Sequence, residues 1–227
     1  MRPGPRRSIT QSGIVTAAFE ILEQSGFAAV SIRGVAAALG LTPTAMYTYF
    51  PSKQDLLRAM VEALFAGVSA DATDAARMAD AAGATDATDA ADAASDEIAR
   101  ERLVAAAIDL GRRLREHPGA VSLVTGDGVA GAGTVGLIER LGQGFVAGGL
   151  SVDDAARAAH ALLAHTIGQV ALEQAWGAAS VDVAETQLWS DEPARPVAEA
   201  GERLGLRAGD PGEFRASVAR LVAAWLR

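Results

Sequence analysis

Residues 40–57 read G-L-T-P-T-A-M-Y-T-Y-F-P-S-K-Q-D-L-L, and this stretch decides the fold. Gly40 suits a tight turn, and Pro43 suits the first position of a helix, where a missing backbone N–H costs nothing. A second helix start follows, because Ser52 and Asp55 have the spacing of a capping box. A short helix between these signals is small enough to enter a DNA groove, and its polar flanks can hold phosphates.

The residues around this stretch predict further helices. Apolar residues recur at helical spacing from Ile9 to Ser25, and Gly26 is typical of a helix end. Ser31 is suited to cap a second, short helix. After Ser52 the apolar residues continue into a longer fourth helix. Four helices, two of them short and joined by a glycine turn, predict a helix-turn-helix module.

The rest of the chain also predicts helices. Helical periodicity is present in residues 98–116, 137–147, 151–176 and 212–227, whereas residues 119–136 are rich in glycine and are expected to be irregular. Only 5% of the 227 residues are aromatic, so strand formers are sparse. We therefore predict an all-α protein in two parts.

Composition excludes several classes of protein. The chain has no cysteine, which excludes disulfides and thiolate metal sites. It has no apolar run of the roughly 18 residues that a membrane span needs, and no apolar signal core, so we expect a soluble cytoplasmic protein without a membrane partner. The net charge of the chain is −8, but this charge is unevenly distributed. Residues 1–60 hold six basic and three acidic groups and have a net charge of +3, so the remaining residues have a net charge of −11. A basic N-terminal part in an otherwise acidic chain is compatible with binding to phosphates.

Residues 69–97 differ from their surroundings. They are almost entirely Ala, Asp, Thr and Gly, with eight acidic residues and one basic residue, Arg77. Like charges and the lack of large apolar side chains leave a helix here nothing to pack against. We interpret this segment as either a flexible linker or a frayed extension of a helix.

Residues 8–65 resemble the DNA-binding domain of the tetracycline-repressor (TetR) family of bacterial regulators. The matching residues are Ser31-Ile32-Arg33, Val35-Ala36, Gly40-Leu41-Thr42, Tyr47-Thr48-Tyr49-Phe50, Ser52-Lys53 and Leu56-Leu57. The resemblance implies a basic arm over 1–8, a helix-turn-helix domain of three helices within 9–68, a linker over 69–97 and a helical ligand-binding and dimerisation domain over 98–227. The arm, with Arg2, Arg6 and Arg7, either follows the DNA or is only a solubilising tail.

Eight residues are the candidate DNA contacts. Lys53, at the start of the fourth helix, offers a charge and backbone N–H groups to a phosphate, and Tyr47 offers its hydroxyl. Tyr49 either reaches the DNA backbone or is partly buried. The small residues of the third helix and its start are either base contacts or ordinary caps and surface residues, namely Thr42, Thr44, Ala45 and Thr48. The full set is Arg33, Thr42, Thr44, Ala45, Tyr47, Thr48, Tyr49 and Lys53.

The reading helix itself has no Arg, Asn or Gln, the side chains that make bidentate base contacts. The selectivity of the protein for a DNA sequence would then depend on methyl contacts, on Arg33 and on DNA shape. We expect modest discrimination between sequences and strong dependence on salt.

The C-terminal part is similar, more weakly, to the ligand-sensing domain of the tetracycline-repressor subgroup, mainly at Gly149, Leu150, Ala155, Gly168, Glu173 and Gln174. Members that bind the antibiotic hold a magnesium chelate through a histidine soon after a Pro-Gly-Ala sequence. Here His117-Pro-Gly-Ala is followed by Val-Ser-Leu-Val, so we expect an apolar inducer without metal or cofactor. The expected pocket residues are Leu103, Ala107, Leu123, Leu141, Phe145, Leu163, Ile167 and Trp189. Trp189 either closes over the ligand or anchors packing.

One helix-turn-helix module covers half of a palindromic operator, so DNA binding requires a homodimer. The wide apolar faces of 151–176 and 212–227 either form the dimer interface or bury into their own subunit's core. The interface candidates are Ala159, Leu162, Thr166, Val170, Val218, Leu221, Val222 and Trp225. His160 and His165 lie about 140° apart around one helix and do not form a paired metal site.

The sequence favours a ligand-responsive repressor that a small molecule releases from double-stranded DNA. The alternative is a constitutive DNA-binding or protein-interaction module without a ligand. Catalytic motifs are missing, and the glycine-rich Gly126–Gly131 does not follow a strand as a phosphate-binding loop would, so we do not expect an enzyme.

Overall fold

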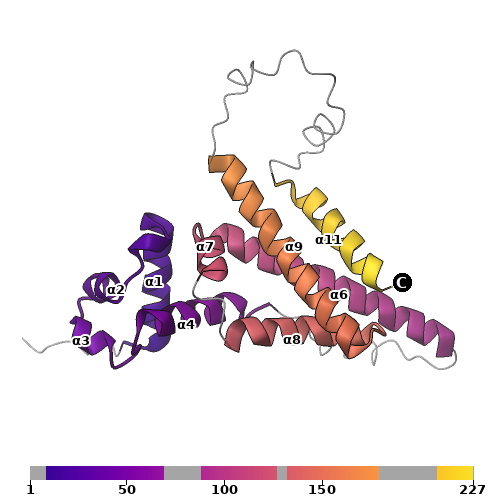
Figure 1. Cartoon of the computed structure of the whole chain (residues 1–227), viewed down its shortest axis with the longest axis horizontal. Helices are drawn as coiled ribbons and strands as arrows, with labels where there is room; N and C mark the ends of the chain where they lie inside the picture. Colours follow the sequence, from indigo (N-terminus) through magenta and orange to yellow (C-terminus); the bar gives the residue numbers. More distant parts are fainter. Residues whose placement is uncertain (1–8, 69–87, 127–131, 179–208, 227) are drawn as a thin grey trace, which may run out of the picture. The chain divides into compact units, whose positions relative to one another are not determined.

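The computed structural model describes residues 9–68, 88–126, 132–178 and 209–226 (Figure 1). Every regular element in these residues is a helix, which confirms the predicted all-α class. None of the described helices is long and apolar enough to cross a membrane. The predictions for the basic arm, for residues 69–87 and for Trp189 fall outside the described residues.

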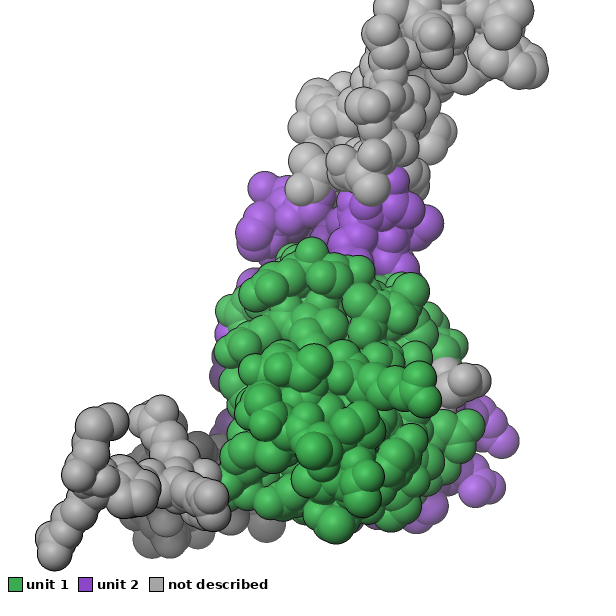
Figure 2. Space-filling model, turned by 90° about the vertical axis from the view of Figure 1, so that its left-hand side faces the viewer, with its two compact units in different colours: residues 1–67, 113–137 green, residues 68–112, 138–227 purple. Residues whose placement is uncertain are grey.

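The chain divides into two compact units, which are coloured separately in Figure 2. Unit 1 consists of residues 1–67 and 113–137, and unit 2 of residues 68–112 and 138–227. The predicted domain boundaries divide the chain by function, and they stay a prediction.

Unit 1 begins with α1 (Gln11–Ser25), the 3-10 helix η1 (Phe27–Ala29), α2 (Ile32–Ala38), α3 (Pro43–Met46) and α4 (Lys53–Phe65). The starts of α2, α3 and α4 follow from local side chains, as predicted. The Ser31 hydroxyl accepts a hydrogen bond from the Gly34 N–H at 3.0 Å, and the Thr42 hydroxyl accepts one from the Ala45 N–H at 3.2 Å. Gly40 forms the turn between α2 and α3 with a φ of +66°, which other residues rarely adopt.

The core of unit 1 joins these helices to a segment far along the chain. Fully buried apolar side chains come from α1, α2, α3 and α4, namely Ile14, Ala18, Leu22, Val35, Met46, Leu56 and Met60. The helix α7 (Ala120–Thr125) packs against α4 and η1 and buries Leu123. Just before α7, His117 Nδ1 lies 2.6 Å from Glu23 Oε1, and its ring is 4.7 Å from the Phe19 ring.

The prediction of irregular structure over 119–136 was wrong where the structure describes this segment. Residues 120–125 form α7, and α8 (Ala132–Ala147) begins before residue 137. Glycine weakens a helix by only about 1 kcal/mol, and burial of Leu123 and Leu137 exceeds that cost. Tertiary packing therefore overrides local propensity here.

Unit 2 contains most of α6 (Thr88–Glu116) and α8, together with α9 (Val152–Ala178) and α11 (Pro211–Trp225). The helix α11 lies alongside α9 (Figure 1). Its end is held by Leu226, which is buried against Gly148 and whose carbonyl accepts a hydrogen bond from Arg100. Because α6 begins at Thr88, residues 88–97 belong to a helix, which agrees with the helix-extension alternative for that part of the linker.

Candidate DNA-binding site

The segment that follows the α2–α3 turn presents small polar side chains. The helix α3 is a single turn, and residues 47–49 continue it as a turn. Two of its hydroxyls are already used within the segment, because Thr42 caps the helix and the Thr48 hydroxyl donates to the Ala45 carbonyl at 2.6 Å. Of the three threonines here, only Thr44 has a hydroxyl with no partner among the described residues.

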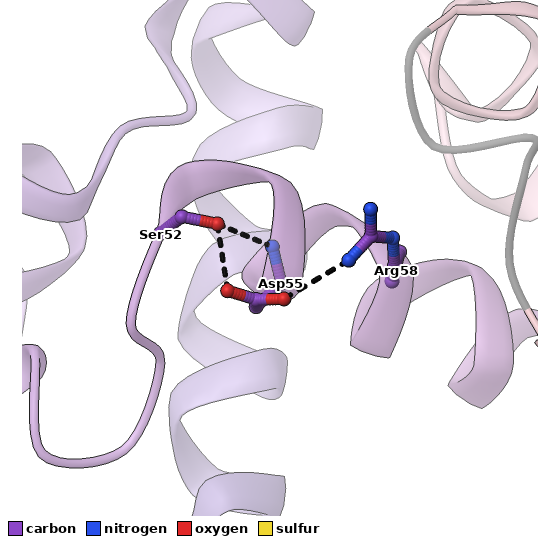
Figure 3. Close-up of polar contacts among 3 residues, drawn as sticks. All are labelled: Ser52, Asp55 and Arg58. Carbon is purple, nitrogen blue, oxygen red and sulfur yellow. Dashed lines mark hydrogen bonds and ion pairs between the residues drawn. The ribbon is translucent and has the colours of Figure 1, made fainter.

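The start of α4 is fixed by three neighbouring side chains (Figure 3). The Ser52 hydroxyl accepts from the Asp55 N–H at 3.2 Å and donates to Asp55 Oδ2 at 2.7 Å. Arg58 Nη1 donates to Asp55 Oδ1 at 3.0 Å. Both carboxylate oxygens of Asp55 are thus engaged, and Arg58 balances the charge that would otherwise repel a phosphate. Lys53 occupies the first position of the helix, where the backbone N–H groups have no partner within the helix.

Six of the eight predicted DNA contacts are exposed: Arg33, Thr42, Thr44, Tyr47, Thr48 and Lys53. Ala45 and Tyr49 are half-buried. Tyr47 is 52% exposed, which is unusual for an aromatic side chain in a small domain. The exposed residues come from α2, from the α3 segment and from the start of α4, all within unit 1.

The sequence did not identify two residues that support this site. Gln11, in the first turn of α1, donates from Nε2 to the Tyr49 carbonyl at 3.0 Å and so anchors the end of the α3 segment. The Phe27 ring lies under Lys53, with the ammonium nitrogen 5.6 Å from the ring centroid. Both contacts join residues far apart in the chain, and no spacing rule points to them.

Comparison with known proteins identifies this unit. Residues 14–60 match the family described as "Bacterial regulatory proteins, tetR family". This segment is a DNA-binding domain of the TetR type. Its helices therefore form a helix-turn-helix DNA-binding domain of this family, which confirms the resemblance found in the sequence.

Individual relatives match more of the chain than this segment. A possible TetR family transcriptional regulator from Streptomyces coelicolor A3(2) is 27% identical, with a TM-score of 0.68 over 95% of this chain and 98% of that one. A TetR variant from Acinetobacter baumannii AYE in complex with minocycline shares the fold, with a TM-score of 0.61 at 19% identity over 96% of each chain. An HTH-type transcriptional regulator from Saccharopolyspora erythraea is 27% identical over 168 residues, which span 74% of this chain and only 62% of that relative's length.

The predicted pocket residues are distributed over both units. Leu103, Ala107, Leu141, Phe145 and Leu163 are buried in unit 2, Ile167 is half-buried there, and Leu123 is buried in unit 1. None of them lines the hollow of about 310 Å³ between α8 and α9, which is formed by Ile138, Glu139, Gly142, Gln143, Val146, Val152, Ala155 and Ala156. The ligand pocket stays a prediction.

The predicted interface residues are mostly buried within one subunit. Ala159, Leu162, Thr166, Val170, Val218 and Val222 are at most 1% exposed, and only Leu221 and Trp225 are half-buried. The alternative interpretation, that these faces bury into their own subunit's core, describes the six buried side chains. An interface formed by α9 and α11 would use other residues, such as Leu172, which is 48% exposed.

The histidines of α9 have different surroundings. His160 is exposed, and its Nδ1 lies 2.8 Å from the Ala156 carbonyl. His165 Nε2 lies 3.1 Å from the Ser217 hydroxyl, which itself donates to the Phe214 carbonyl, so His165 is the donor of this bond. Burial lowers the pKa of His165. The described residues hold no cluster of three or more potential metal ligands.

Proposed function

We propose that this protein is a homodimeric repressor that binds a palindromic operator and is released from it by a small apolar molecule. The observation that carries the proposal is the exposed polar surface of unit 1, formed by Arg33, Tyr47 and Lys53 around the α3 segment. In this arrangement α3 enters the major groove, and the start of α4 binds a phosphate.

The strongest phosphate contact is assigned to Lys53. Its ammonium group has no carboxylate partner within the described residues, since the nearby Asp55 is bound to Ser52 and Arg58. Each phosphate that a cation neutralises contributes about 0.9 to the slope of log affinity against log salt. Lys53 and Tyr47 therefore account for affinity, whereas the α3 segment and Arg33 account for the choice of sequence.

The experiment is a selection of duplexes from a random pool by the unmodified 227-residue protein, followed by affinity measurements by fluorescence anisotropy. We expect an inverted repeat whose half-sites lie about 34–36 Å apart. Lys53→Ala should weaken operator binding and lower the salt slope by about 1.8, because each of the two subunits loses one phosphate contact. Thr44→Ala should reduce the preference for the operator over a scrambled duplex and leave the salt slope unchanged.

Two results would contradict the proposal. One is a wild-type protein that binds the selected duplex no better than a scrambled one. The other is a Lys53→Ala variant with unchanged salt dependence. The matched control is Arg112→Ala, which removes an exposed positive charge of α6 in unit 2 and should leave both DNA affinity and the salt slope unaltered.

The dimer is proposed to form through exposed residues of α9 and α11. Leu172 is 48% exposed, and an apolar side chain of this size on a helix face is suited to an interface. Leu172→Glu should convert the dimer to a monomer in analytical ultracentrifugation and abolish operator binding. A variant that remains dimeric would place the interface elsewhere.

The ligand is proposed to bind among the apolar helices of unit 2. The TetR variant from Acinetobacter baumannii binds minocycline with the same fold, which supports a ligand site in this protein. A panel of apolar metabolites and antibiotics should contain compounds that both raise the unfolding temperature and release the operator. If no compound does either, the alternative of a constitutive DNA-binding module is favoured.

A further inference from the structure

Lys53 is held by an aromatic ring from another element. Its ammonium nitrogen lies 5.6 Å from the centroid of Phe27, which is within the distance for a cation–π contact. Lys53 remains exposed, while Phe27 is half-buried. One side of the ammonium group thus faces the ring, and the other sides stay open to a ligand.

Phe27 also lies close to the end of α7. Phe27 begins η1, which packs against α7. A Cβ placed on Gly126, the residue that ends α7, would lie 3.7 Å from Phe27 Cζ, so the ring edge is within contact distance of this position. The ring is therefore close both to the end of α7 and to the first residue of α4.

Charged neighbours do not explain the position of Lys53. Asp55, two residues on, has its two carboxylate oxygens bound to Ser52 and Arg58. Within the described residues, the contact of the ammonium group is with the Phe27 ring.

We propose that Phe27 is a positioning residue for phosphate binding: its ring holds the Lys53 ammonium group at the start of α4, in place for a DNA phosphate. This inference rests on the proposed function. A free lysine loses rotamer freedom when it is fixed on a phosphate, and a ring that already restricts the side chain reduces that loss. The gain corresponds to about a two- to fivefold higher affinity for each half-site, the range of one exposed cation–π contact.

The test weakens the negative face of the ring without removing it. Trifluorophenylalanine in place of Phe27 keeps the apolar ring but withdraws charge from its face, on which the attraction of a cation depends. In the dimer of the whole chain, this change should weaken binding to the selected operator about five- to thirtyfold, because both subunits carry it. In a Lys53→Gln background, the same change should have no effect. A double-mutant cycle of Phe27→Leu and Lys53→Gln repeats this test with natural residues.

A matched control separates this effect from general changes in unit 1. Phe19 is another half-buried phenylalanine of unit 1, and it contacts His117 instead of Lys53. Fluorination at Phe19 should leave operator affinity unchanged. Thermal unfolding of each variant checks that the fold is retained.

The outcomes distinguish this inference from the proposed function. If fluorination of Phe27 weakens binding equally with Lys53 and with Gln at that position, the ring acts on the fold and the inference is wrong. Unchanged or tighter binding also overturns it, the latter because the ring would then compete with the phosphate. A wild-type protein without operator preference overturns the proposed function itself, and this inference with it.

Discussion

Replacement of Gly119 by alanine is expected to destabilise unit 1 by about 2–5 kcal/mol. Gly119 precedes α7 with a φ of +89°, and a left-handed backbone costs a residue with a Cβ about 1–2 kcal/mol. The new Cβ would also lie 2.9 Å from Leu22 Cδ1. Leu22 is fully buried in the core of unit 1, so its displacement adds about 1–3 kcal/mol of overpacking.

The matched control is Gly40→Ala in the same unit. Gly40 has a φ of +66°, and a Cβ placed there meets nothing within 4 Å, so only the backbone cost of about 1–2 kcal/mol applies. Urea unfolding followed by circular dichroism measures both variants. The unfolding constant of Gly119→Ala should exceed that of Gly40→Ala by about 5- to 160-fold, which corresponds to the overpacking alone.

A double-mutant cycle identifies the side chain responsible. Leu22→Ala removes Cδ1 and costs about 2–5 kcal/mol by itself, but it also removes the atom that the new Cβ approaches. The double variant should therefore be less destabilised than the sum of the two single variants, by about 1–3 kcal/mol. Equal stabilities of Gly119→Ala and Gly40→Ala, or additive effects in the cycle, would show that Leu22 moves aside without cost and would refute the reasoning.

Three further outcomes are expected from the contacts of single side chains. Because burial lowers the pKa of His165, its imidazole is protonated at a higher pH in the unfolded chain than in the folded chain. The free energy of unfolding therefore decreases as the pH falls below about 6.5 and levels off below the pKa of the folded state. His165→Gln should remove part of this loss in urea unfolding at pH values near 7.5 and 5, and an unchanged loss would contradict the prediction. Ser52→Ala should cost about 1 kcal/mol of stability through the lost cap of α4, measured by urea unfolding, and an unchanged midpoint would contradict the cap. Leu226→Ala should destabilise unit 2 by about 2–5 kcal/mol, measured by thermal unfolding, and a smaller loss would mean that the contact with Gly148 is not tightly packed.

Helix starts were predictable from the sequence because they depend on near neighbours. A capping side chain bonds to a backbone N–H three residues on, so both partners lie in one short stretch of sequence. The hydroxyls of Ser31, Thr42, Ser52 and Ser151 all make this bond in the structure. The same local rule explains why the helix-turn-helix module could be recognised before its packing was known.

Contacts between distant residues could not be predicted in this way. The Gln11–Tyr49 hydrogen bond spans 38 residues, and the His117–Glu23 pair spans 94. Neither side chain belongs to a pattern with a fixed spacing, and each partner is of an ordinary type for a helix surface. The position of Phe27 under Lys53 depends in the same way on how η1 and α4 pack.

Helical periodicity also does not say which neighbour covers an apolar face. It identified the buried sides of α9 and α11 correctly as apolar, but the same pattern is produced by burial against a partner subunit and by burial in the subunit's own core. In the structure α11 covers α9, and Val170 and Val218 are fully buried within one chain. For these residues, the partner assignment needed the fold.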